Sequence, residues 1–138
     1  MEIRQFRVVV RAKNFERTCR FYGESLALPR LQSWDGEASR GAIYQAGSAM
    51  IEILGRPAGQ VGQAGDTPRV RDEVFEYQGP QQKMTLTFVV PSAEKAYEEL
   101  LFRDKNIPGG LRREEGGTLI FETHDPDGVR IVYRQAEV

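Results

Sequence analysis

The sequence of 138 residues contains one cysteine, Cys19, and one histidine, His124. A single thiol cannot form an intramolecular disulfide or a thiolate metal cluster, and a single imidazole excludes any site that needs two from one chain. No apolar stretch approaches the roughly 18 residues that a membrane-spanning helix requires. The N-terminal residues also lack the apolar segment of a signal peptide. We therefore expect a cytoplasmic protein that does not enter a membrane.

An excess of charge of one sign is also missing. The chain has 19 lysines and arginines against 20 aspartates and glutamates, which gives a formal net charge of −1. This balance argues against a nucleic-acid-binding protein, which concentrates positive charge. Hydrophobic residues make up 40 % of the sequence, so a chain of this length can build the core of one domain, predicted to span residues 1–138.

The first half of the chain predicts a strand, a helix and three further strands. The apolar run Val8-Val9-Val10 is typical of a buried strand. Asn14 is a good N-cap for a helix with apolar residues at helical spacing, and Pro29 ends that helix. The three strands that follow are predicted at residues 30–34, 41–46 and 49–54.

The second half repeats this order. A strand at residues 84–90 precedes a helix that begins after Pro91-Ser92, and further strands are predicted at 111–114, 118–123 and 129–134. The repeat divides the chain into modules at 4–54 and 82–135, joined by a glycine- and proline-rich linker at 55–81. The predicted fold class is α+β, with two βαβββ modules whose mixed sheets form a curved half-barrel, with a cleft inside it and the helices outside.

Two motifs resemble those of a known superfamily. Asn14 and Thr18 precede Phe21-Tyr22 and Leu26, with Ala27 at a position where the family usually has glycine, and the second half ends in Asp125-Pro126-Asp127-Gly128 before an apolar strand. This pattern is similar to the glyoxalase/bleomycin-resistance/extradiol-dioxygenase superfamily. The resemblance covers nearly the whole chain outside the linker, and it implies the vicinal oxygen chelate fold and a homodimer.

The resemblance also implies four metal-ligand positions, one on each of four strands, usually held by His, Glu or Gln. They fall here at Arg7, Glu52, Thr85 and Val132. Only Glu52 is a plausible ligand, because Arg7 would repel a cation and Val132 has no lone pair. We therefore expect no metal or other cofactor, and we predict that Arg7 and Glu52 pair with each other at the former metal position.

Strand alternation extends the predicted site from these positions to their neighbours on the same face. The candidate ligand-binding residues are Arg7, Arg11, Trp34, Tyr44, Met50, Glu52, Thr85, Thr87, Arg130 and Val132. In the alternative interpretation these residues do not bind a ligand. The arginines form ordinary solvated ion pairs, and the aromatic residues, including Phe75 and Tyr77 of the linker, pack within the protein. A cysteine on the apolar face of a helix, such as Cys19, is expected to belong to the core.

The favoured function is a metal-free protein that captures a small organic ligand, similar to the drug-sequestering resistance proteins of the superfamily. The alternative is a lyase, isomerase or dioxygenase in which Glu52 serves as the general base or as a metal ligand. A third possibility is a regulatory or interaction module whose cleft has closed. The expected partners are a small-molecule ligand and a second copy of the chain, rather than nucleic acid or a membrane.

Overall fold

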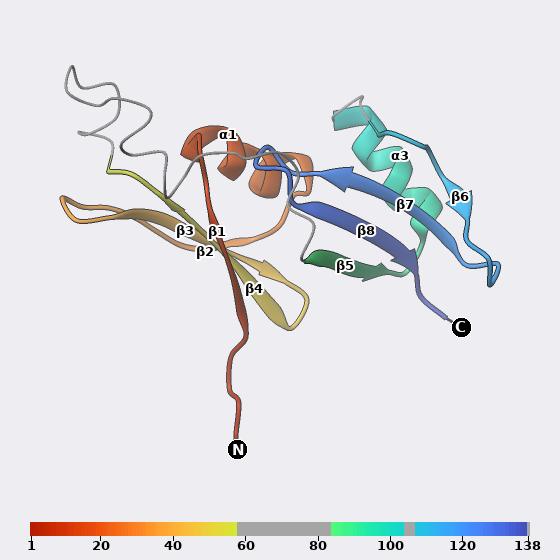
Figure 1. The fold of residues 1–138 in the computed structure, drawn as a ribbon, viewed down its shortest axis with the longest axis horizontal. Coiled ribbons are helices and arrows are strands. Elements are labelled where there is room, and N and C mark those ends of the chain that lie inside the picture. Colours follow the sequence, from red (N-terminus) through yellow and green to blue (C-terminus); the bar gives the residue numbers. More distant parts are fainter. Residues whose placement is uncertain (58–83, 104–106, 138) are drawn as a thin grey trace. The chain divides into compact units, whose positions relative to one another are not determined.

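The computed structural model describes residues 1–57, 84–103 and 107–137. The chain divides into two compact units, Met1–Tyr77 and Gln78–Val138. Each unit holds one open, mixed sheet of four strands together with a helical segment between its first and second strands (Figure 1). This order confirms the predicted α+β class with two βαβββ modules.

The first unit has a four-stranded sheet in which only the pair formed by the first and last strands in sequence is parallel. Its elements are β1 (Arg7–Arg11), α1 (Phe15–Arg20), the π-helix η1 (Phe21–Ser25), β2 (Arg30–Asp35), β3 (Arg40–Ala46) and β4 (Ala49–Gly55). The strand order is β1-β4-β3-β2, with β1 parallel to β4 and the other pairs antiparallel.

The helix of the first unit begins as predicted and ends differently. The Asn14 side chain accepts a hydrogen bond from the Arg17 backbone N–H at 3.1 Å, which is the expected cap. From Phe21 the α-helix gives way to a π-helix, closed by the Leu26 N–H on the Phe21 carbonyl at 2.9 Å. The prediction of one regular helix up to Pro29 was therefore wrong. Ala27, with a φ of 56°, turns the chain out of the helix before the proline is reached.

Strand β1 is less buried than its three consecutive valines indicated. Only Val10 is buried, whereas Val9 is 42 % exposed. The reason is that β1 is an edge strand whose side chains alternate between two faces, and the helix packs against only one of these faces.

The second unit repeats the topology of the first. Its elements are β5 (Thr85–Val90), α3 (Ala93–Arg103), β6 (Arg112–Arg113), β7 (Leu119–His124) and β8 (Arg130–Gln135). The order is β5-β8-β7-β6, with β5 parallel to β8. Figure 1 shows α3 beside β7, and the Tyr97 ring of α3 contacts Phe121 of β7 at 5.4 Å between centroids.

Two boundaries in this unit correct the sequence prediction. The strand predicted at 111–114 is reduced to Arg112–Arg113, because Gly109 and Gly110 both have positive φ and bend the chain just before it. β7 is shifted by one residue from the strand predicted at 118–123, and its last residue, His124, pairs in register with Arg130. Residues Asp125 to Gly128 of the motif form a turn between β7 and β8, in which the Gly128 N–H donates to the Asp125 carbonyl at 3.0 Å.

Most of the predicted linker, together with Phe75 and Tyr77, lies outside the described residues, and Gly55 belongs to β4. In the parts of the chain that the structure describes, no helix is long and apolar enough to cross a membrane.

Candidate ligand-binding site

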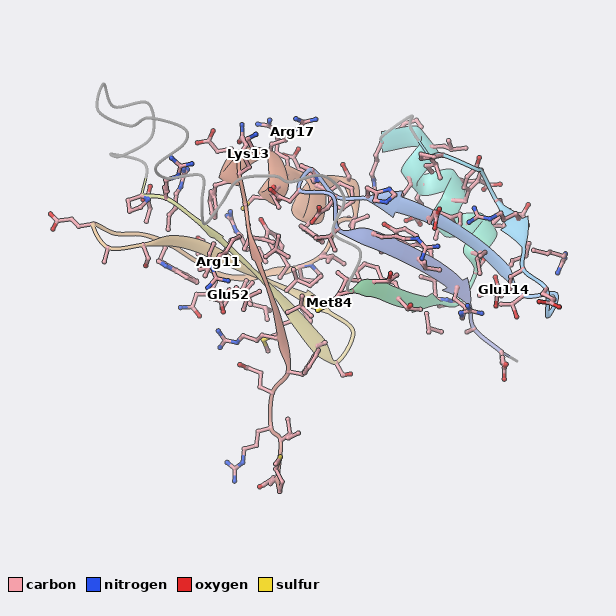
Figure 2. The ribbon with its side chains drawn as sticks, viewed as in Figure 1. Arg11, Lys13, Arg17, Glu52, Met84 and Glu114 are labelled. Atoms are coloured by element: carbon pink, nitrogen blue, oxygen red, sulfur yellow. The ribbon has the colours of Figure 1, made fainter. Side chains whose placement is uncertain are left out.

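The first sheet has a face turned away from α1, which we call the first open face. Alternation along β1 places Arg7 and Arg11 on it, and alternation along β4 places Met50 and Glu52 there. The opposite face of β4 carries the buried residues Ile51 and Ile53. Four of the predicted site residues are therefore brought together on one sheet surface (Figure 2 labels Arg11 and Glu52).

An ion pair occupies this face. Nη1 of Arg7 donates to Oε1 of Glu52 at 2.8 Å, which confirms the predicted pairing of these two side chains. The Arg7 side chain is 39 % exposed and that of Glu52 is 15 % exposed, so the pair is only partly buried. Nε of Arg7 donates to Oε1 of Gln5 at 2.6 Å. The guanidinium therefore bridges two acceptors instead of forming a two-bond fork with the carboxylate.

Trp34 shares the first open face. In register it pairs with Gly41, which in turn pairs with Leu54 of β4. Its ring lies directly on Gly41, since a Cβ at that position would come within 2.2 Å of the indole. The indole Nε1–H donates to the Ser39 hydroxyl at 3.0 Å, which fixes the ring orientation.

The structure places Tyr44 on the opposite face from Trp34. Tyr44 pairs in register with Ile51 on the helix-covered side of the sheet, and only 3 % of it is exposed. Its hydroxyl donates to the Cys19 carbonyl at 3.3 Å. Tyr44 therefore does not lie with Arg7 and Glu52.

The remaining predicted residues lie on the corresponding face of the second sheet, the second open face. Thr85 pairs in register with Arg130, and Thr87 pairs with Val132. Both threonines are exposed, whereas Val132 is 7 % exposed. The face presents two hydroxyl groups beside an arginine.

Sequence reasoning missed the carboxylate at the centre of the second open face. Glu122 of β7 pairs in register with Val132. Nε of Arg130 donates to Oε2 of Glu122 at 2.7 Å, and Nη2 of Arg112 lies 3.6 Å from Oε1. The signal was present in the sequence, because the turn at Asp125–Gly128 sets which residues of β7 and β8 face each other. Arg130 is therefore in an ion pair, as the alternative interpretation held.

A second ion pair of this unit joins Arg134 to Glu114. Nη2 of Arg134 donates to Oε2 of Glu114 at 2.9 Å, and Nη1 contacts the other carboxylate oxygen. The hydrogen bond from Arg134 lowers the pKa of the Glu114 carboxyl below its ordinary value. Both side chains are partly exposed to solvent.

Comparison with known proteins places the chain in a family. The sequence model of the Glyoxalase/Bleomycin resistance protein/Dioxygenase superfamily matches residues 4–133. The chain belongs to this superfamily. A search of curated proteins finds none that matches the sequence.

Solved structures share the fold of this chain at low sequence identity. A glyoxalase I mutant from Zea mays has a TM-score of 0.74 at 20 % identity, covering 98 % of this chain and 45 % of the maize chain. A glyoxalase family protein from Enterococcus faecalis has a TM-score of 0.64 at 21 % identity, with 96 % of each chain covered. A protein of unknown function from Agrobacterium tumefaciens has a TM-score of 0.68 at 17 % identity, covering 99 % of this chain and 97 % of the other. At such identities these likenesses show the fold alone.

The side chains at the four positions implied by the superfamily do not fit a metal ion. In the first unit, Oε1 of Glu52 already accepts from the Arg7 guanidinium, and a divalent cation there would face a fixed positive charge. In the second unit, Thr85 pairs in register with Arg130, whose positive charge would repel a cation, and Val132 offers no donor atom. Among the described residues, no group of three or more His, Cys, Asp and Glu side chains could hold a metal ion.

Proposed function

We propose that this chain binds a small organic ligand on the open faces of its sheets without a metal ion. The Arg7–Glu52 ion pair supports this proposal most directly, because it joins two of the positions at which the resemblance implies metal ligands. The positive charge that balances Glu52 is then part of the protein. Ligand binding would need no metal to neutralise the carboxylate.

The first open face offers both polar and apolar contacts to such a ligand. Nε of Arg7 donates to Gln5 and Nη1 donates to Glu52, whereas Nη2 has no hydrogen-bond partner among the described residues. Trp34 and Val9 add apolar surface on the same side of the sheet. Trp34 is on β2, at the opposite edge of the sheet from Arg7 on β1, so it would contact a ligand that extends across this face.

The ion pair also favours binding over catalysis by Glu52. A general base gives up its negative charge when it takes a proton. If Glu52 did so, the Arg7 guanidinium would lose the charge that it now contacts at 2.8 Å. Each proton abstraction would therefore weaken the contact that fixes this carboxylate in position.

A ligand screen by thermal unfolding tests the proposal. Aromatic and heteroaromatic compounds would be screened against the wild-type chain with and without EDTA, and each stabilising compound then tested on Arg7→Ala. Arg17→Ala is the matched control, since it removes an exposed arginine of the same unit from helix α1. We expect stabilisation that survives EDTA and Arg17→Ala and is lost in Arg7→Ala. Stabilisation that EDTA abolishes would contradict metal-free binding.

We further propose that the protein is a cytoplasmic homodimer. Exposed apolar side chains support association, among them Phe6 at 61 % and Leu31 at 49 % exposure. The sheets are also open, and their edge strands are available for pairing within the described residues. Sedimentation at micromolar concentration is expected to give twice the 15.6 kDa chain mass, and a clean monomer would contradict the dimer.

A further inference from the structure

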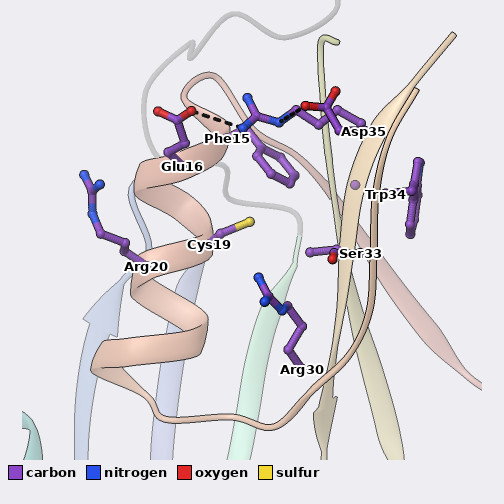
Figure 3. A pocket seen from close by; sticks show the side chains of 11 residues that line it. Phe15, Glu16, Cys19, Arg20, Arg30, Ser33, Trp34 and Asp35 are labelled. Atoms are coloured by element: carbon purple, nitrogen blue, oxygen red, sulfur yellow. Dashed lines mark hydrogen bonds and ion pairs between the residues drawn. The ribbon is translucent and has the colours of Figure 1, made fainter. Parts of the chain in front are cut away.

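A groove lies on the other side of the first sheet, between helix α1 and strand β2 (Figure 3). We call it the helix groove. Phe15 and Cys19 of the helix, Arg30 and Ser33 of β2, and Ala42 of β3 line it, and its volume is about 550 Å³. A second hollow of about 380 Å³ shares Cys19 and Arg30 with it.

The helix groove exists because the residues that face each other across it are small. Ser33 and Ala42 are neighbours in register on the helix side of the sheet, and Cys19 faces them from the helix. A helix packed on a sheet usually fills this space with large apolar side chains. Ala42 is buried, with 1 % of it exposed, and the room for a ligand lies over the exposed Ser33 and the half-buried Cys19.

The acidic side chains at one end of the helix groove are already paired. Nη2 of Arg40 contacts Oε1 of Glu16 at 3.1 Å, and its Nε lies 3.7 Å from Oδ2 of Asp35. The same guanidinium lies 4.4 Å from the centre of the Phe15 ring. At this end of the groove, the charges of Glu16 and Asp35 are therefore compensated by Arg40, which lies over the Phe15 ring.

The guanidinium of Arg30 has no carboxylate partner among the described residues. Figure 3 shows it pointing into the space between helix and strand, toward the side of the groove where Cys19 lies, whereas Arg20 points away. Glu24 lines the adjoining hollow, but no ion pair joins it to Arg30 within the described parts of the chain. The groove therefore presents one uncompensated positive charge.

Two neutral polar groups, the Cys19 thiol and the Tyr44 hydroxyl, also lie near Arg30. Burial raises the pKa of the Cys19 thiol above its ordinary value. Burial also raises the pKa of the Tyr44 hydroxyl to about 12. Neither group supplies the negative charge that would satisfy Arg30 at neutral pH, and the thiol is not activated as a nucleophile.

We propose that the helix groove binds a small organic carboxylate with a compact apolar body. The carboxylate would accept hydrogen bonds from the Arg30 guanidinium and the Ser33 hydroxyl. The apolar body would lie against the partly exposed Phe15 and Cys19 side chains. This site is separate from the first open face, because the side chains that form it lie on the opposite side of the same sheet.

Alkylation of the only cysteine tests this site directly. Benzoate is the probe, benzamide is its neutral counterpart, and iodoacetamide at alkaline pH labels Cys19 without bringing a charge of its own. We expect benzoate to slow labelling of the wild-type chain in a saturable way and benzamide to have no such effect. Absence of protection by benzoate, or equal protection by benzamide, would overturn the proposal.

Variants separate this site from the one on the first open face. Arg30→Gln is expected to weaken benzoate protection about tenfold, whereas Arg17→Gln and Arg7→Ala are expected to leave it unchanged. Protection that Arg7→Ala removes and Arg30→Gln preserves would assign benzoate to the first open face and overturn the proposal. Backbone amide shifts of the wild-type chain give a second measurement, with benzoate expected to shift the Ser33 and Cys19 signals and not that of Val9.

Discussion

Replacing Arg7 by methionine should destabilise the protein more than replacing Glu52 by leucine. The Glu52 side chain is only 15 % exposed, so without Arg7 its charge is held largely away from water with no partner. The Arg7 side chain is 39 % exposed and can be rehydrated when Glu52 is lost. Breaking a fully buried pair costs about 3–5 kcal/mol and an exposed pair contributes at most about 1 kcal/mol. For this intermediate pair we expect a loss of about 2 kcal/mol for Arg7→Met and about 1 kcal/mol for Glu52→Leu.

The double variant makes the prediction quantitative. With both charges removed, no charge is left unpaired, and the cost should be about that of Glu52→Leu alone. The resulting coupling is about 2 kcal/mol, above the error of about 0.5 kcal/mol for additive sites. Urea unfolding at low salt, followed by Trp34 fluorescence, measures all four proteins. Additive single effects, or a larger loss for Glu52→Leu than for Arg7→Met, would refute this reasoning.

Three further changes have defined outcomes. Ala27→Gly should raise the free energy of unfolding by about 0.5–1 kcal/mol, because Ala27 holds a φ of 56° that glycine adopts without strain; an unchanged or lower value in urea unfolding would count against this. Gly41→Ala should cost about 1–3 kcal/mol and shift the Trp34 emission to longer wavelength, since the new Cβ would lie 2.2 Å from the ring; unchanged emission would show that the ring does not lie there. Arg134 lowers the pKa of Glu114, so the pair stabilises the fold above the ordinary carboxyl range and loses this effect as the pH falls through the lowered pKa. In Arg134→Ala an NMR titration should show the Glu114 pKa back at its ordinary value, and an unchanged pKa would contradict the assigned cause.

Local signals predicted the elements well, because capping and turn chemistry act over a few residues. Asn14 and Ser92 cap the two helices through backbone N–H groups three residues on, as their positions indicated. The π-helix from Phe21 was not predicted, because its apolar residues also fit α-helical spacing. The two-residue length of β6 depends on the backbone bend at Gly109 and Gly110, which composition alone does not specify.

The part of the candidate site that lies on one pair of neighbouring strands could be predicted from the sequence. Arg7 and Glu52 lie on neighbouring strands, and alternation places both on one face. To predict the face on which Tyr44 lies, the register of the β3–β4 hairpin is required. The turn at Gly47-Ser48 determines this register, because it sets Ala46 opposite Ala49 and therefore Tyr44 opposite Ile51. The helix groove could not be predicted, because it depends on how far the helix stands from β2.

Equilibrium dialysis of the chelator-treated chain against Zn²⁺, Mn²⁺, Fe²⁺ and Ni²⁺ tests the central claim most directly. The Arg7 guanidinium contacts Glu52 at the position where the superfamily implies a metal ligand. We therefore predict that no metal ion binds stoichiometrically in a way that depends on Glu52. One equivalent of any of these ions bound by the wild-type chain and lost in Glu52→Ala would contradict the account.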